Sequence, residues 1–155
     1  MTRLYGRSFN GQRVYDSVPH GHWCTTTMVS VMGLKGPKAP FVFEGGMDAE
    51  AFRVYIEKVL VPELRRGDII VMDNLSSHKD SQARQMIEDA GALIWDLPPY
   101  SPDFNPIEEM WSKVKGVLRQ AKARTSDTLI QAIAEALESI TEEDCIGWFK
   151  HRGYL

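Results

Sequence analysis

The segment "DIIVMDN" (Asp68–Asn74) is the strongest indication of fold in this chain of 155 residues. It places four consecutive apolar residues between Asp68 and Asp73. A short apolar run without alternation is typical of a strand buried on both faces, as in parallel or mixed sheets covered by helices. We therefore predict a buried strand over Asp68–Met72, with Asp73 at its C-terminal end.

Apolar patterns on either side of this strand predict an alternation of strands and helices. Further strands are expected at Cys24–Gly33, Phe41–Gly46 and Ala92–Leu97, with a turn over "GLKGPKAP" (33–40). Helices are expected from Asp48 to a stop at Gly67, and over Lys79–Ala90, Ile107–Gln120, Asp127–Ile140 and Glu142–Phe149. This order of elements predicts one layered α/β domain.

The composition is that of an ordinary globular protein, with 43% apolar and 25% charged residues. The net charge of −3 argues against a surface that is basic throughout, so any binding of nucleic acid needs a local basic patch. The start "MTRLYGRSFNGQR" is not a signal peptide, and no apolar run is long enough to cross a membrane. The two cysteines are far apart, which indicates free thiols in a reducing cytoplasm.

Asp73 has two interpretations. Ligands and catalytic groups of open α/β sheets collect at the C-terminal edge of the strands, where Asp73 is expected. Alternatively, Asp73 and Asn74 form a turn or cap the next helix. Position alone leaves both open.

The segment "LPPYSPDFNPIEEMW" (Leu97–Trp111) places four prolines in nine positions, yet it carries apolar residues that a solvated linker lacks. Asn105 suits a helix N-cap and Pro106 the first helical position, so Glu108 can close a capping box without any chemistry. A carboxylate in the first helical turn is also a good ligand for a hard cation. Asp73 and Glu108 are therefore a candidate Mg²⁺ pair, held apart by a stiff proline segment.

Two sequence motifs of this chain resemble those of the catalytic domain of DDE transposases. The motifs are "VMDNLSSHK" (Val71–Lys79) and "LPPYSPDFNPIEEMWSKVK" (Leu97–Lys115), with 34 residues between Asp73 and Glu108. The nearest branch looks like the bacterial insertion-sequence transposases of the mariner superfamily. The segments "MTRLYGRSFNGQRV", "LRQAKARTSDTLIQAI" and "GWFKHRGYL" also look like that branch, so the likeness covers nearly the whole chain.

The resemblance implies a ribonuclease H-like fold, in which helices flank a mixed five-stranded sheet. By position, Asp73 matches the second catalytic Asp and Glu108 the catalytic Glu, while Asn74, His78 and Asn105 accompany them. In the family, two Mg²⁺ or Mn²⁺ ions activate the attacking oxygen and stabilise the leaving one. Water first cuts the end of the mobile element, and the freed 3′-hydroxyl then attacks target DNA. The resemblance also implies a homodimer acting on DNA in a bacterial cytoplasm, associated with the nucleoid.

The family uses three carboxylates, and this chain offers two. The first Asp should end a central strand shortly before "RLYGR" (Arg3–Arg7), which would place that strand upstream of Met1. Asp16 does not match that position. We therefore expect residues 1–155 to be a single catalytic domain that lacks its first strand and the DNA-recognition domain. Such a chain should bind metal weakly and be catalytically inactive alone.

Three origins of such a chain stay open: a truncated transposase, the second half of a frameshifted protein, or an internal-start product that pairs with the full enzyme. Two other functions also stay open. One is a non-catalytic fragment that binds DNA or pairs with a transposase subunit. The other is a related nuclease that cuts DNA without joining it.

A run of basic residues follows Glu108. Lys115, Arg119 and Lys122 fall at helical spacing and are expected to share one face, which could contact phosphates. The alternative is a solvated helix surface. The whole candidate patch comprises Lys113, Lys115, Arg119, Lys122 and Arg124.

Overall fold

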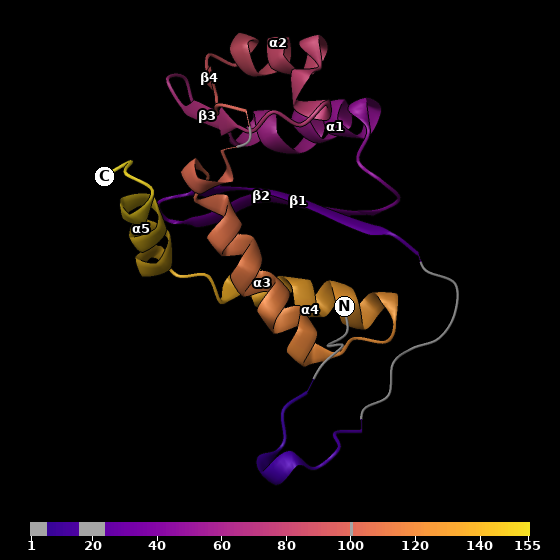
Figure 1. Cartoon of the computed structure of the whole chain (residues 1–155). Coiled ribbons are helices and arrows are strands. Elements are labelled where there is room, and N and C mark those ends of the chain that lie inside the picture. Colours follow the sequence, from indigo (N-terminus) through magenta and orange to yellow (C-terminus); the bar gives the residue numbers. More distant parts are fainter. Residues whose placement is uncertain (1–5, 16–23, 100) are drawn as a thin grey trace.

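The computed structural model describes residues 6–15, 24–99 and 101–155. Its strands are β1 (Thr26–Gly33), β2 (Gly36–Glu44), β3 (Ile69–Met72) and β4 (Leu93–Asp96). Its α-helices are α1 (Ala49–Tyr55), α2 (Ser81–Asp89), α3 (Ile107–Ala121), α4 (Ser126–Glu138) and α5 (Glu142–His151) (Figure 1). The predicted order of strands and helices is confirmed. Asp16 and Arg3–Tyr5 lie outside the described residues.

Strands β1 and β2 form an antiparallel hairpin that runs from the pair Thr26–Glu44 to the pair Gly33–Gly36. The prediction of a turn over residues 33–40 was wrong, because the loop is only Leu34 and Lys35 and β2 starts at Gly36. The prolines of "GPKAP" are tolerated because β2 pairs with β1 alone in the described part of the chain.

Strands β3 and β4 pair in parallel, from Ile69 beside Leu93 to Met72 beside Asp96. Parallel pairing brings both C-terminal ends to the same edge. The predicted burial on both faces is wrong. One face packs into the core through Met72, whereas Ile69, Leu93 and Trp95 are 45%, 56% and 56% exposed. Among the described residues, helices cover only one face of this pair.

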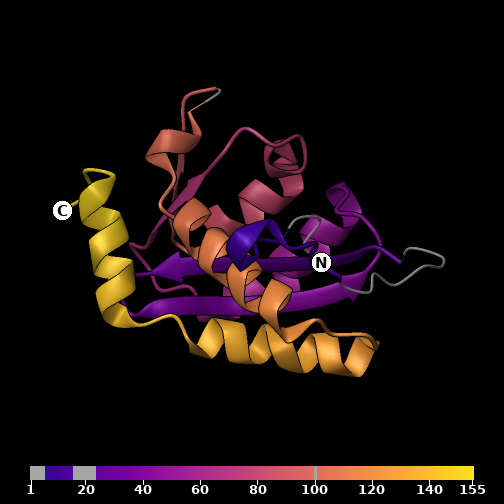
Figure 2. The same cartoon turned by 60° about the horizontal axis from the view of Figure 1, so that its bottom comes forward.

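The hairpin lies between two helical layers (Figures 1 and 2). Its side chains alternate as strand geometry requires. Val29 and Val31 pack against the core cluster of α1 and α2, which includes Phe52 and Tyr55. Met28 and Met32 pack against the cluster of α3 and α4 on the opposite face, which is centred on buried side chains of these helices: Met110, Val114, Ile133 and Ala136.

The helix predicted to begin at Asp48 ends irregularly, as Pro62 in its last part predicts. The Asp48 carboxylate caps α1 by accepting a hydrogen bond from the Ala51 N–H at 2.8 Å. After Tyr55 the chain passes through a π-helical turn (Ile56–Leu60) and a 3₁₀ turn (Val61–Glu63). Pro62 has no N–H to continue the α-helical ladder, which accounts for the irregular end.

The expected five-stranded sheet is not formed by the described residues. Their four strands make two separate pairs, and β1 is not hydrogen-bonded to β3. None of the helices in the described part of the chain combines the length and apolar character that a membrane span requires. Cys24 is exposed and Cys145 is buried, and both are free thiols as predicted.

The Tyr55 hydroxyl provides a test of how the hairpin is joined to α1. It is buried and donates a hydrogen bond of 3.0 Å to the carbonyl of Ala39, whose φ of 48° is in the left-handed region. Burial raises the pKa of Tyr55. We expect Tyr55→Phe to lower the free energy of unfolding by about 1–2 kcal/mol in urea titrations, because the buried carbonyl loses its partner. Tyr15→Phe, at a ring that is 82% exposed, is the control and should have little effect.

Candidate active site

Asp73 follows directly after β3, and its carboxylate has two partners. Its Oδ1 accepts a hydrogen bond from the Leu75 N–H at 3.1 Å and lies 2.7 Å from Nδ1 of His78. The His78 ring packs against Phe52, with ring centroids 4.9 Å apart. The turn interpretation of Asp73 is therefore correct, but its side chain remains 41% exposed and available to a ligand.

Asn74 ties the C-terminal edge of the β3–β4 pair to the proline segment. Its side-chain amide donates to the carbonyl of Leu97, and the Leu97 N–H donates to the Met72 carbonyl at 2.8 Å. The proline segment thus leaves the sheet beside Asp73. This contact gives Asn74 a structural role.

A second tie at the same edge is the ion pair between Arg84 of α2 and Asp96 of β4. The guanidinium donates two hydrogen bonds to the carboxylate, at 2.9 and 2.7 Å. Bonding to Arg84 lowers the pKa of Asp96 below its usual range. The pair fixes the end of β4 relative to α2.

Glu108 lies in the first turn of α3, but the predicted capping box is not formed. The helix begins at Ile107 after Pro106, and the Asn105 side chain accepts from the Ile107 N–H at 3.3 Å. Asn105 thus caps the helix start as predicted, but the Glu108 side chain makes no reciprocal bond to the Asn105 N–H, so only the capping-box role of Glu108 was wrong. The Glu108 side chain is exposed, with no hydrogen bond or ion pair to any described residue. It is therefore free to bind a ligand.

Two residues near the C-terminus hold the turn that precedes α3, and the sequence analysis missed both. Arg152 donates a hydrogen bond of 2.8 Å to the Asp103 carbonyl, and its guanidinium pairs with Glu109 at 2.5 Å. The Tyr154 hydroxyl donates to the Phe104 carbonyl at 2.9 Å. Both residues lie in "GWFKHRGYL" (Gly147–Leu155), a segment that supports the family resemblance but indicates no contact with the turn.

The two predicted carboxylates line one cavity of about 560 Å³, together with His78 and Asn105. Both carboxylates therefore border the same cavity. Carboxylate oxygens are the ligands that Mg²⁺ and Mn²⁺ prefer, so these two residues fit part of a divalent-metal site. Within the described ranges, no group of three or more His, Cys, Asp or Glu side chains is arranged to hold a metal ion.

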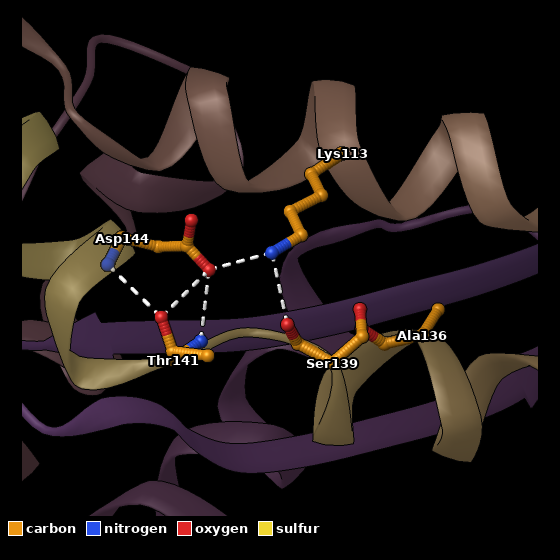
Figure 3. Close-up of polar contacts among 5 residues, drawn as sticks. All are labelled: Lys113, Ala136, Ser139, Thr141 and Asp144. Carbon is orange, nitrogen blue, oxygen red and sulfur yellow. Dashed lines mark hydrogen bonds and ion pairs between the residues drawn. The ribbon is translucent and has the colours of Figure 1, made fainter.

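The predicted basic patch is divided by the structure. Lys113 donates to the Ser139 carbonyl at 2.9 Å and pairs with Asp144 at 2.5 Å, which joins α3 to the start of α5 (Figure 3). The hydrogen bond from Lys113 is the main cause that lowers the pKa of Asp144. Lys113 therefore has a structural role.

The other basic residues lie toward the end of α3. Lys115 and Arg119 are exposed on the helix. Lys122 is not on the predicted helix face, because α3 ends at Ala121 and Lys122 has a left-handed φ of 48°. Arg124 follows in the connection to α4.

Comparison with known proteins decides the family. The model of the DDE superfamily endonuclease family matches residues 1–130. The chain belongs to this family. It is 28% identical over 75 residues to the Tc1 transposase of Caenorhabditis elegans, covering 48% of this chain and 28% of that protein. It is 25% identical over 100 residues to the Tcb1 transposase of Caenorhabditis briggsae, covering 62% and 37%.

Two similar solved structures support the fold. The Mos1 strand transfer complex superposes with a TM-score of 0.69 at 15% identity, over 99% of this chain and 50% of that one. The Mos1 mariner paired end complex with Mn gives 0.67 at 16% identity, over 99% and 51%. The predicted ribonuclease H-like fold is thereby confirmed. The chain spans less than two-fifths of the curated relatives and about half of the Mos1 chain, and the bacterial branch stays a prediction.

The ion pair between Arg152 and Glu109 should support the turn before Glu108. Its side chains are 19% and 21% exposed, so Arg152→Met leaves a largely buried carboxylate without its partner. We expect a loss of about 2–3 kcal/mol in the free energy of unfolding. Adding Glu109→Gln should recover at least about 1 kcal/mol of this loss in a double-mutant cycle. Lys150→Met, at an exposed position of α5, is the matched control, and additive losses in the cycle would contradict the coupling.

Proposed function

We propose that this chain is the catalytic domain of a Tc1/mariner-type DNA transposase. The reaction is metal-dependent cleavage at the ends of a mobile element, followed by transfer of the 3′-hydroxyl into target DNA. One observation carries the proposal: Asp73, at the end of β3, and Glu108, at the start of α3, line the same cavity. These are the two acidic residues that match the family's motifs.

The two carboxylates have complementary roles in this mechanism. Asp73 is oriented by the Leu75 N–H and His78, so its Oδ1 is engaged by the protein, while no described residue hydrogen-bonds to its Oδ2. Glu108 is held through its backbone in the first turn of α3. Divalent ions bound here would activate the attacking oxygen and stabilise the leaving one.

The proposal also has to account for the third carboxylate that the family uses. We infer that it comes from a strand outside the described residues, and that this chain alone binds metal weakly and turns over slowly or not at all. The names of the relatives favour a transposase over a non-catalytic DNA-binding or subunit-pairing fragment. Strand-transfer products would separate a transposase from a nuclease that only cuts.

The partners and location follow from the same proposal. The Mos1 structures are a strand transfer complex and a paired end complex with Mn, which supports DNA as substrate and Mg²⁺ or Mn²⁺ as cofactor. We propose a homodimer, or pairing with a separately encoded segment, in a bacterial cytoplasm and near the nucleoid. We assign the phosphate contacts to Lys115 and Arg119, because Lys113 forms an ion pair with Asp144.

Metal binding tests the pair of carboxylates directly. Titration of the 155-residue chain with Mn²⁺, followed by electron paramagnetic resonance, should show weak binding that Asp73→Asn and Glu108→Gln each reduce about tenfold, the loss of about 1.4 kcal/mol expected for one ligand. Asp127→Asn, an exposed carboxylate in the first turn of α4, is the matched control. Binding that neither site variant changes would disprove the site. DNA nicking by this chain that Asp73→Asn abolishes would instead disprove its inactivity.

Salt dependence tests the proposed phosphate contacts. If Lys115 and Arg119 each neutralise one phosphate of a DNA duplex, the double change to Ala should reduce the slope of log K against log salt by about 1.8. Fluorescence anisotropy with a labelled duplex at several salt concentrations measures this slope. Lys35→Ala, in the hairpin loop, should leave it unchanged. An equal slope for the double variant and the wild type would show that Lys115 and Arg119 do not contact phosphates and lie on an ordinary solvated surface of α3.

A further inference from the structure

Each of the two segments that carry the candidate carboxylates also presents one large apolar side chain to solvent. Leu75 follows shortly after Asp73 and is 56% exposed. Phe104 precedes the helix turn that carries Glu108 and is 51% exposed. Leu75 lines the cavity of the candidate site, and so does Asn105, the residue after Phe104. Exposed apolar side chains thus stand at the border of the cavity in both segments.

Packing within the described part of the chain does not account for the Phe104 ring. The ring belongs to neither of the two hydrophobic clusters. It also stacks on no other aromatic ring of the described residues. Single exposed apolar residues are common on protein surfaces, so exposure alone indicates no function. The way in which its backbone is held distinguishes this ring from an ordinary exposed one.

The backbone of the Phe104 turn is tied to the C-terminal end of the chain. The turn is a short 3₁₀ segment, Pro102–Phe104. Its Asp103 carbonyl accepts a hydrogen bond from Arg152 at 2.8 Å, and its Phe104 carbonyl accepts one from the Tyr154 hydroxyl at 2.9 Å. The chain therefore fixes the backbone of a ring that it leaves in solvent. A ring on a fixed backbone loses little conformational entropy when a ligand binds to it.

The chemistry of the site limits what such a ring can bind. In the proposed function a phosphodiester reacts at the two carboxylates, so a ring at the border of the cavity meets the adjoining nucleotide. Nucleobases have flat faces that stack on aromatic side chains whatever the sequence. In an uninterrupted duplex both faces of a base are covered by its neighbours, so the ring can stack only on a base that has left the stack. The ring therefore favours DNA that is unpaired beside the reacting phosphate.

We propose that Phe104 is a base-stacking residue, which binds an unpaired nucleotide next to the reacting phosphodiester. The preferred substrate is then DNA whose strands are separated at the site of reaction, rather than continuous duplex. Leu75 supplies a second apolar contact at the border of the same cavity. The proposal rests on the proposed function for the identity of the ligand as DNA, but it requires neither metal nor catalysis.

Binding of two DNA duplexes of equal length and charge tests this role. One duplex is fully paired, and the other has strands of the same length with mismatched pairs at one end. Fluorescence anisotropy with the 155-residue chain, in the presence of a chelator of divalent metals, gives both dissociation constants. We expect the mismatched duplex to bind about tenfold more tightly, because stacking of one base contributes on this scale and the number of phosphates is unchanged.

Substitutions relate this preference to the ring. Phe104→Leu should give equal dissociation constants for the two duplexes, whereas Phe104→Trp should retain the preference, because an indole also stacks on bases. Leu75→Ala should lower the preference less than Phe104→Leu does. Trp95→Leu is the matched control and should retain the preference, because Trp95 is 56% exposed but does not line the cavity. Circular dichroism of each variant establishes that it is folded.

A fluorescent base gives a second measurement that a change in folding or charge would not reproduce. The adenine analogue aminopurine, placed at a mismatched position, is quenched when an indole stacks on it. We expect Phe104→Trp to quench this base more strongly than the wild type does, because only the variant has an indole at the border of the cavity.

The possible failures can be told apart. Equal binding of the two duplexes by the wild type, or a preference that survives Phe104→Leu, would disprove the stacking role and leave the proposed function intact. Absence of binding to either duplex would disprove both. A preference that Trp95→Leu removes as well would place the stacking outside the cavity border. A dimer in sedimentation velocity that Phe104→Leu dissociates, with the preference retained, would place the ring against a second copy of the chain.

Discussion

The parallel pairing of β3 with β4 is the constraint on which the candidate site depends. It brings the C-terminal ends of both strands to one edge, so that Asp73 and Leu97 leave the sheet side by side. The hydrogen bond from Leu97 to Met72, with the Asn74 side chain on the Leu97 carbonyl, continues this pairing beyond the strands. The proline segment, which begins at Leu97, therefore leaves the sheet beside Asp73.

The two carboxylates of the site are held in different ways, and the difference matters for chemistry. Asp73 is fixed by bonds to its own side chain, whereas Glu108 is placed by the backbone around it and has no partner among the described residues. Two carboxylates that line one cavity repel each other and attract a cation between them. The site is therefore arranged for a positively charged ligand, and its affinity depends on how rigidly α3 is held. Arg152 and Tyr154 supply that rigidity from the far end of the chain.

The sequence predicted what local patterns control and missed what distant contacts control. The ends of β3 and β4 and the positions of Asp73 and Glu108 followed from apolar runs, turn residues and motif wording. The pairing of Arg152 with the turn at Asp103 joins residues 49 apart, and nothing in either segment indicates the other. Lys113 was included in the predicted phosphate-contacting patch for the same reason, because its partner Asp144 is 31 residues away. The solvent-exposed face of β3 and β4 could not be predicted either. An apolar run shows that a strand can be buried, but it does not show whether other elements cover it.

The fold supports its two strand pairs unequally, and this affects the site. The hairpin has a buried cluster on each face, one with α1 and α2 and the other with α3 and α4. The β3–β4 pair has a cluster on one face only, and Leu93 and Trp95 are exposed on the other. Regions with fewer buried apolar contacts open more readily, so the strand that carries Asp73 should be the less stable part of the domain. The two hydrogen bonds from Arg84 to Asp96 of β4 help to stabilise the β3–β4 pair, whereas the hairpin is stabilised mainly by burial. A cation that binds between the two carboxylates only in the folded domain then stabilises this part of the chain by mass action.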